Sequence, residues 1–253
     1  MSQTIDFRIV VVTDGHWGSD RADYTQWPDY EDWEDLHNDA LNRISAIHTD
    51  QEVDLVIHNG DAVHDDHALH SELITNFFDK LPTGVSWEIT YGNHDWSTET
   101  EWQNTYGHSN FRHAETYGNY GFLFPNAGGA PGTASFDPEV QNNIDVNWIE
   151  SELDSFESQG VDGVFVSHHV PPFTDNDDWG VDLPDVRTQY ARDIVRAVFL
   201  GHNHEKNFVE SKYGTKYVYA SRIGGADGTS SNGHSIDTPD GFGVRVFDIM
   251  GDE

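Results

Sequence analysis

Short apolar runs rich in β-branched residues recur along the chain and predict buried strands. They cover residues 7–12, 53–57, 85–90, 120–124, 164–166 and 197–200. Continuous apolar runs of this kind are typical of strands that are buried on both faces of a sheet. The chain is therefore expected to build its sheets from segments that are spread over most of its length.

Between the predicted strands, apolar residues recur every three or four positions, as on the buried face of an amphipathic helix. The predicted helices cover residues 31–49, 69–81, 146–156 and 185–195. Residues 96–119 show little periodicity. After residue 200 only strands are predicted, over residues 207–212, 216–220 and 244–249, with a hairpin tip at residues 213–215. Alternating strands and helices followed by consecutive strands predict a mixed α/β sandwich.

The composition fits one globular domain over residues 1–253, with 36% hydrophobic and 13% aromatic residues. The chain has no cysteine, which excludes disulfides, thiolate metal sites and cysteine nucleophiles. No apolar run approaches the roughly 20 residues of a membrane span. The first twelve residues lack the basic and long apolar regions of a signal peptide. We therefore expect a cytoplasmic protein that does not bind membranes.

The charge balance is strongly acidic, with 45 Asp and Glu against 13 Lys and Arg and a formal net charge of -32. Such a charge repels itself at low ionic strength, whereas molar salt shortens the screening length to about 3 Å. The acidic residues are spread along the whole chain. We therefore expect a high-salt environment, as in a salt-accumulating halophile, and an acidic mesophilic protein is the alternative.

Polar residues that bind metals follow five of the predicted strands. The five segments are Asp14-Gly15-His16, Asn59-Gly60-Asp61, Gly92-Asn93-His94-Asp95, His168-His169 and Gly201-His202-Asn203-His204. Loops at the carboxyl ends of neighbouring strands converge, and the glycines are expected to let the backbone turn sharply there. Each segment alone is a weak signal, because an isolated histidine is more often an ordinary surface or core residue. All five together, each after a strand, predict one metal site.

In this order, the five segments resemble the calcineurin-like metallophosphoesterase family, whose signature is D-x-H, G-D, G-N-H-D/E, a lone H and G-H-x-H. The resemblance covers roughly residues 9 to 204. It implies a four-layer α/β/β/α sandwich, in which two mixed sheets are packed together and flanked by helices.

The resemblance also implies two divalent metal ions. One would be held by Asp14, His16 and His204, and the other by Asn93, His202 and a histidine of the 168–169 pair, with Asp61 bridging both. The family ligand usually precedes a proline by two places, which favours His169, whereas strand length favours His168. Imidazole and carboxylate ligands suit Mn, Zn, Fe, Co or Ni, and a bridging carboxylate suits ions about 3.5–4 Å apart.

The expected reaction is hydrolysis of a phosphate ester. Two cations lower the pKa of a bridging water, and the hydroxide attacks phosphorus in line with the leaving oxygen. Asp61 and His94 are the expected catalytic residues, since His94 matches the family histidine that protonates the leaving group. Asp65 or Asp95 would orient His94.

The expected substrate is a small or nucleotide-like phosphate ester, cleaved by a phosphodiesterase or a phosphatase. Residues 14–18 together with His64 resemble the nuclease branch of the family, so a nuclease is the nearest alternative. A nucleic-acid partner is possible in that case, but no basic patch indicates one. His64 replaces the metal-binding tyrosine of purple acid phosphatases, which argues against that variant. A non-catalytic, metal-binding assembly protein is the second alternative. The sequence carries no signal for oligomeric state.

Overall fold

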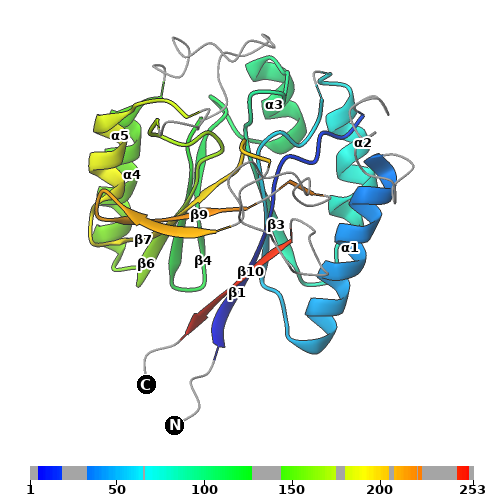
Figure 1. Cartoon of the computed structure of the whole chain (residues 1–253), viewed down its shortest axis with the longest axis horizontal. Coiled ribbons are helices and arrows are strands. Elements are labelled where there is room, and N and C mark those ends of the chain that lie inside the picture. Colours follow the sequence, from blue (N-terminus) through cyan, green and yellow to red (C-terminus); the bar gives the residue numbers. More distant parts are fainter. Residues whose placement is uncertain are drawn as a thin grey trace, which may run out of the picture.

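Two β-sheets packed face to face form the centre of the computed structural model, with helices on both outer sides (Figure 1). The structure describes residues 5–18, 33–64, 66–126, 144–174, 180–204, 208–220, 222–223 and 244–250.

The first sheet has the strand order β10-β1-β2-β3. Strands β1 (Ile5–Val12), β2 (Leu55–Asn59) and β3 (Ser86–Thr90) are parallel, and β10 (Arg245–Met250) pairs antiparallel with β1. Helices α1 (Trp33–Asp50) and α2 (Leu69–Asn76) lie on its outer side (Figure 1).

The second sheet has the order β4-β5-β6-β7-β9-β8. Its parallel centre consists of β5 (Tyr120–Phe124), β6 (Gly163–Ser167), β7 (Val195–Leu200) and β9 (Thr215–Tyr219). The edge strands β4 (His113–Tyr117) and β8 (Val209–Lys212) are antiparallel to their neighbours. Helices α4 (Val146–Gln159) and α5 (Pro184–Tyr190) cover its outer side (Figure 1).

Three apolar layers result, because successive strand residues point to opposite faces. In β1, Val10 and Val12 pack toward α1 and α2, whereas Ile9 and Val11 pack between the sheets. The middle layer also contains Phe122 and other aromatic side chains of the second sheet, and the third layer lies under α4 and α5. The expected four-layer sandwich of two mixed sheets flanked by helices is confirmed.

The largest differences from the prediction lie in three places. The helix expected over residues 69–81 ends at Asn76 and continues as a short 3-10 helix, Phe78–Lys80, because this break lets adjacent Phe77 and Phe78 both become buried. The helix expected to reach residue 195 ends at Tyr190, since β7 begins at Val195.

The aperiodic segment contains α3 (Glu99–Tyr106) and β4, neither of which was predicted. Helix α3 buries only Trp102 and Tyr106, so its apolar periodicity is too short to recognise. Among the described helices, none has the length and apolar character needed to cross a membrane.

Candidate metal centre

The loops that follow β1, β2, β3, β6 and β7 meet at the carboxyl ends of the two sheets. Backbone hydrogen bonds fasten them together. The N–H of Asp14 donates to the carbonyl oxygen of Gly60 at 3.0 Å, and that of His16 donates to Asp61 at 2.9 Å. The N–H of Gly201 donates to the carbonyl oxygen of His169 at 2.9 Å, which joins the two loops of the second sheet.

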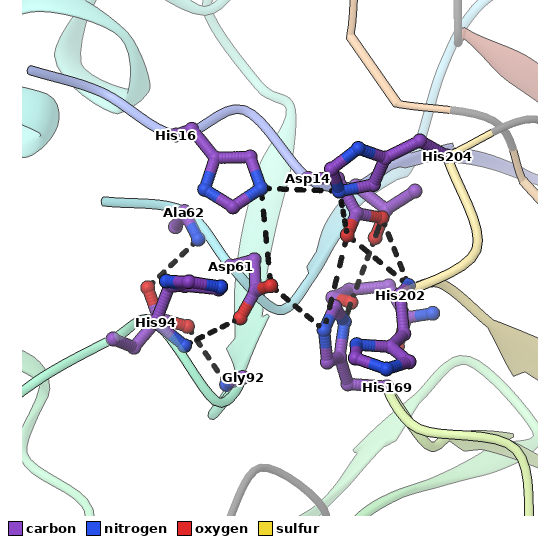
Figure 2. Close-up of polar contacts among 12 residues, drawn as sticks. Asp14, His16, Asp61, Ala62, Gly92, His94, His169, His202 and His204 are labelled. Carbon is purple, nitrogen blue, oxygen red and sulfur yellow. Dashed lines mark hydrogen bonds and ion pairs between the residues drawn. The ribbon is translucent and has the colours of Figure 1, made fainter. Parts of the chain in front are cut away.

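Two groups of potential metal ligands lie side by side at this edge. Asp14, His16 and His204 form one group, and Asp61, His169 and His202 form the other; within each group the donor atoms lie within 4.8 Å of one another. Figure 2 shows the imidazoles arranged around the two carboxylates.

Asp61 and His169 connect the two groups. His169 Nε2 lies 3.2 Å from Asp61 Oδ2 and 3.8 Å from Asp14 Oδ1. Asp61 Oδ2 is also 3.9 Å from His16 Nε2, which belongs to the other group. In the first group, His204 Nε2 lies 3.3 Å from Asp14 Oδ1 and 3.2 Å from His16 Nε2. Asp61 therefore faces both groups.

The adjacent histidines 168 and 169 point in different directions. His169 Nδ1 is 2.7 Å from the carbonyl oxygen of Asn59, so this nitrogen donates and Nε2 is directed at the carboxylates. His168 Nδ1 instead contacts the hydroxyl of Tyr190 at 2.6 Å, under α5. Of the two, only His169 reaches the ligand groups.

Asn93 and His94 lie beside Asp61. The N–H of His94 donates to Asp61 Oδ1 at 2.7 Å, and the side chain of Asn93 is buried. Asp95 accepts hydrogen bonds from the N–H groups of Ala62, Val63 and Gly92, so this carboxylate holds two loops together. All three of these hydrogen bonds come from backbone groups. Asp65, the other carboxylate expected to orient His94, lies outside the described residues.

Four of the candidate ligands adopt a left-handed backbone conformation that L side chains rarely adopt. Their φ angles are 52° for Asp14, 45° for His16, 48° for Asp61 and 63° for His202. Such a conformation costs of order 1–3 kcal/mol at each residue and persists only where the surroundings enforce it. Clustering of this strain at one edge of the sheets is typical of a functional site.

Glycines permit the close approach of the loops. Gly60 has a φ of 86°, and a Cβ at this position would lie 2.5 Å from the ring of His169. Gly92 and Gly201 have no positive φ, although the backbone turns sharply after each, as expected: the N–H of Asp95 donates to the carbonyl oxygen of Gly92 at 3.3 Å, and that of Asn203 donates to that of Gly201 at 2.7 Å. A Cβ at position 92 would lie 2.0 Å from Asp61 N, and one at position 201 would lie 2.2 Å from Thr13 Oγ1. These two glycines are needed for space.

The buried side chains combine two ionised carboxylates with one protonated imidazole and so keep a net negative charge. Burial opposes ionisation of Asp14 and Asp61, but His169 holds the pKa of both carboxyls below the usual range. Burial alone would lower the pKa of His169, yet Asp61 and Asp14 raise it to about 9. Burial lowers the pKa of His202 to about 4 and that of His16 well below its usual value. The latter two imidazoles are therefore neutral, with lone pairs available for a cation.

The residues fit a pair of divalent cations. Asn93 Oδ1 is buried and has no hydrogen-bond partner among the described residues, as expected of an oxygen directed at a cation. The raised pKa of His169 means that positive charge is favoured between the two carboxylates. A bound cation would supply that charge in place of the proton. Carboxylate, amide oxygen and imidazole are ligands that Mn, Zn, Fe, Co and Ni share.

Some neighbouring residues were not assigned from sequence. The side chain of Thr13 donates to Asp14 Oδ2 at 2.6 Å, and Asn59 accepts from His169 through its carbonyl oxygen. Thr13 directly precedes the polar segment at residues 14–16, and Asn59 begins the one at residues 59–61. These positions were the only indication of their role in the sequence. The ring of His64 is stacked on that of His94, with centroids 5.1 Å apart, and its Nδ1 lies 3.2 Å from His16 Nδ1.

The chain is similar to known proteins in sequence and in fold. The family model for calcineurin-like phosphoesterases matches residues 7–206. No curated protein matches the chain. Among solved structures, a dimetal phosphatase from Danio rerio superposes with a TM-score of 0.66 and 13% identity, covering 88% of this chain and 90% of that protein.

Two nucleotidases also share the fold. A 5'-nucleotidase from Staphylococcus aureus, described as putative, has a TM-score of 0.52 and 15% identity, covering 98% of this chain and 55% of that protein. The NAD nucleotidase of Haemophilus influenzae has a TM-score of 0.51 and 9% identity, with 96% and 50% covered. This chain thus spans about half the length of either. With the family match over most of its length, the chain belongs to the calcineurin-like phosphoesterase family.

Proposed function

We propose that this protein hydrolyses phosphate esters of small or nucleotide-like substrates with two divalent metal ions. The observation that carries the proposal is the pair of adjacent ligand groups, with the carboxylate of Asp61 facing both. Asp14, His16 and His204 would hold one ion, and Asn93, His169 and His202 the other. Asp61 would bridge them.

When bound, the two cations supply an activated water near neutral pH and neutralise charge on the phosphoryl oxygens. The chain supplies the geometry. The backbone N–H groups of His94 and His202 donate to the carboxylates of Asp61 and Asp14, which fixes those oxygens in place. The Nδ1–H of His169 is held by Asn59, and such support orients a metal-binding imidazole and raises its basicity.

His94 is the proposed acid for the leaving group. It belongs to neither of the two groups that contain Asp14 or Asp61, but its donor atom lies within 4.8 Å of those of His16 and His64; its ring lies 5.0 Å from that of His16 and is partly exposed. As the bond between phosphorus and the leaving oxygen breaks, His94 would transfer a proton to that oxygen. The side chain of His204 is 37% exposed, so a substrate can approach from this side, whereas Asp14, Asp61 and His169 form a buried floor.

The net charge of -32 opposes the approach of a polyanion and so favours a small substrate at low ionic strength, whereas molar salt screens this repulsion. The fold shared with two nucleotidases supports a nucleotide-like ester. A nuclease is the second candidate, because residues 14–18 together with His64 resemble the nuclease branch of the family. The ring of His64 is also stacked on that of His94. Release of nucleotides from single-stranded DNA in molar salt, with no cleavage of small esters, would favour the nuclease.

The net charge of -32 also supports a high-salt setting. We expect the melting temperature to rise steeply between about 0.1 M and molar KCl, because the screening length falls from about 10 Å to about 3 Å. A melting temperature that does not depend on salt would contradict this setting.

The catalytic proposal is tested by hydrolysis of bis-p-nitrophenyl phosphate and p-nitrophenyl phosphate in molar KCl with added Mn²⁺. Wild-type protein should show metal-dependent turnover, and Asp61→Asn should lose at least about 100-fold, or about 2.7 kcal/mol. The control is Asp39→Asn on α1, a half-buried carboxylate that pairs with Arg43 at 2.9 Å and whose change should leave turnover unchanged. Equal turnover by Asp61→Asn and wild type would refute the proposed role of Asp61. The ratio of diester to monoester cleavage would identify a phosphodiesterase or a phosphatase.

A further inference from the structure

Besides the groups that contain His16 or Asp61, a further group of potential metal ligands lies outside the candidate centre. It consists of Glu88 on β3, His108 after α3 and His113 on β4, whose donor atoms lie within 4.8 Å of one another. Glu88 lies five residues before Asn93, which corresponds to on the order of 15 Å along an extended chain. The group is therefore separate from the loops that carry the candidate centre.

The group joins the edges of the two sheets. Strand β3 is an edge strand of the first sheet and β4 is an edge strand of the second. Glu88 pairs in register with Ile57, whose side chain belongs to the layer between the sheets. A cation held here would link two sheets that share no strand.

The donor atoms converge on one carboxylate oxygen. His113 Nε2 lies 2.8 Å and His108 Nε2 lies 3.5 Å from Glu88 Oε2. The two imidazoles are parallel, with an interplanar angle of 3° and centroids 3.5 Å apart. Ligand atoms about 2.0–2.1 Å from a tetrahedral zinc ion are roughly 3.3 Å apart. Because the lone pairs lie in the ring planes, one ion can bind both rings only if the side chain of His108, which is 19% exposed, rotates out of this stack.

Neighbouring side chains hold these ligands in place. The hydroxyl of Tyr117 donates to Glu88 Oε1, which leaves Oε2 for the histidines. The ring of Phe124 is stacked on His113 at 4.3 Å and fixes its plane. Hydrogen-bonded and packed supports of this kind are characteristic of metal sites.

The charge states suit a cation. Burial raises the pKa of Glu88, but hydrogen bonds from His108, His113 and Tyr117 lower it to about 2. Glu88 is therefore a carboxylate at neutral pH. Burial lowers the pKa of His113, which favours the neutral imidazole, and an ion at Nε2 would take the place of the proton that this nitrogen donates to Glu88.

A solvent-accessible cavity gives an ion access to the group. The cavity has a volume of about 340 Å³, and His108, His113, Ser109, Arg112 and Trp148 are among the residues that line it. Water from the cavity can fill a fourth coordination position, as in zinc sites with three protein ligands.

We propose that Glu88, His108 and His113 bind a single divalent transition-metal ion, such as Zn²⁺, that cross-links the edges of the two sheets. The competing interpretation is a hydrogen-bonded brace in which both histidines donate to Glu88 and no ion binds. The two differ in metal content, and this difference does not depend on catalytic activity.

The test counts zinc. Protein stripped with a chelator is equilibrated with excess Zn²⁺ in molar KCl, desalted and analysed by mass spectrometry for zinc per chain. We expect His108→Gln to hold one zinc ion fewer than wild type and to keep its Mn²⁺-dependent phosphoesterase activity. The matched control is His67→Gln, which changes an exposed histidine 3.2 Å from Glu101 and should hold as many ions as wild type.

The Glu88→Gln variant provides a second test, because glutamine can still form hydrogen bonds but lacks the negative charge of the carboxylate ligand. It should also lack one zinc ion, and zinc should raise its melting temperature less than that of wild type. Equal zinc content in wild type, His108→Gln and Glu88→Gln would overturn the proposal in favour of the brace. Absence of phosphoesterase activity in every variant would affect the proposed function and leave this count unchanged.

Discussion

The backbone around Asp61 leaves no room for a side chain at position 92. A Cβ there would lie 2.0 Å from Asp61 N and 2.3 Å from Asp61 Oδ1, closer than real Cβ contacts. Such a clash cannot be relieved by rotating a flexible side chain, because one of the two atoms belongs to the backbone. The position of Asp61 thus depends on a residue with no functional group.

We expect Gly92→Ala to displace the loop at Asp61 and to reduce phosphoesterase turnover at least about 100-fold, as loss of the ligand itself would. The control is Gly160→Ala at the end of α4, where the φ is 74° and no atom lies within 4 Å of the added Cβ. That change should cost about 1 kcal/mol of stability and leave turnover intact. Normal turnover of Gly92→Ala in a folded protein would contradict this account of the loop.

At this scale the sequence predicted the grouping of Asp14, His16, Asp61, His202 and His204, because each lies within a recognisable segment after a strand. It left two histidines open at 168–169. Their directions depend on where β6 ends and on Tyr190, which is far away in sequence. The group of Glu88, His108 and His113 carried no signal, since its members come from an aperiodic segment and from the middle of a strand.

At the scale of elements, buried strands were predicted well because their apolar runs are continuous. Helix α3 was missed, since its stability depends on its ends. Thr98 Oγ1 accepts a hydrogen bond from Glu101 N at 3.3 Å, and the Glu101 carboxylate accepts one from Thr98 N at 2.7 Å. This capping box satisfies backbone donors at the start of a helix with few buried residues.

We therefore expect Thr98→Ala to lower the free energy of unfolding by about 1 kcal/mol. Turnover should change little, because Thr98 is exposed and Glu101 contacts no candidate ligand among the described residues. Denaturant unfolding and the ester assay would check both parts. Unchanged stability would show that the cap contributes nothing.

For the whole molecule, two sheets in one sandwich bury several histidines in neutral form. Burial lowers the pKa of His37 to about 4 and that of His70 to about 3, against 6.5 in the unfolded chain. Both rings are almost fully buried, and His70 Nδ1 lies 2.7 Å from the hydroxyl of Tyr106. Between about pH 6.5 and pH 4 the unfolded chain binds more protons at these sites than the folded protein.

Stability should therefore fall as the pH decreases through this range, by about 1.4 kcal/mol per pH unit for each such histidine. In His70→Gln, the free energy of unfolding should depend less steeply on pH, by about 1.4 kcal/mol per pH unit. Unfolding in denaturant at constant molar KCl, measured every half pH unit, would check this. Identical slopes for wild type and His70→Gln would show that His70 is not responsible.

The most direct test of the central claim compares two adjacent histidines. His169→Gln removes an imidazole that faces Asp61, whereas His168→Gln removes one that contacts Tyr190. If two cations at this edge carry the reaction, His169→Gln should lose at least about 100-fold in Mn²⁺-dependent kcat/KM. His168→Gln should lose stability but keep turnover per folded molecule within a few-fold of wild type. Equal losses, or a greater loss in His168→Gln, would contradict the account.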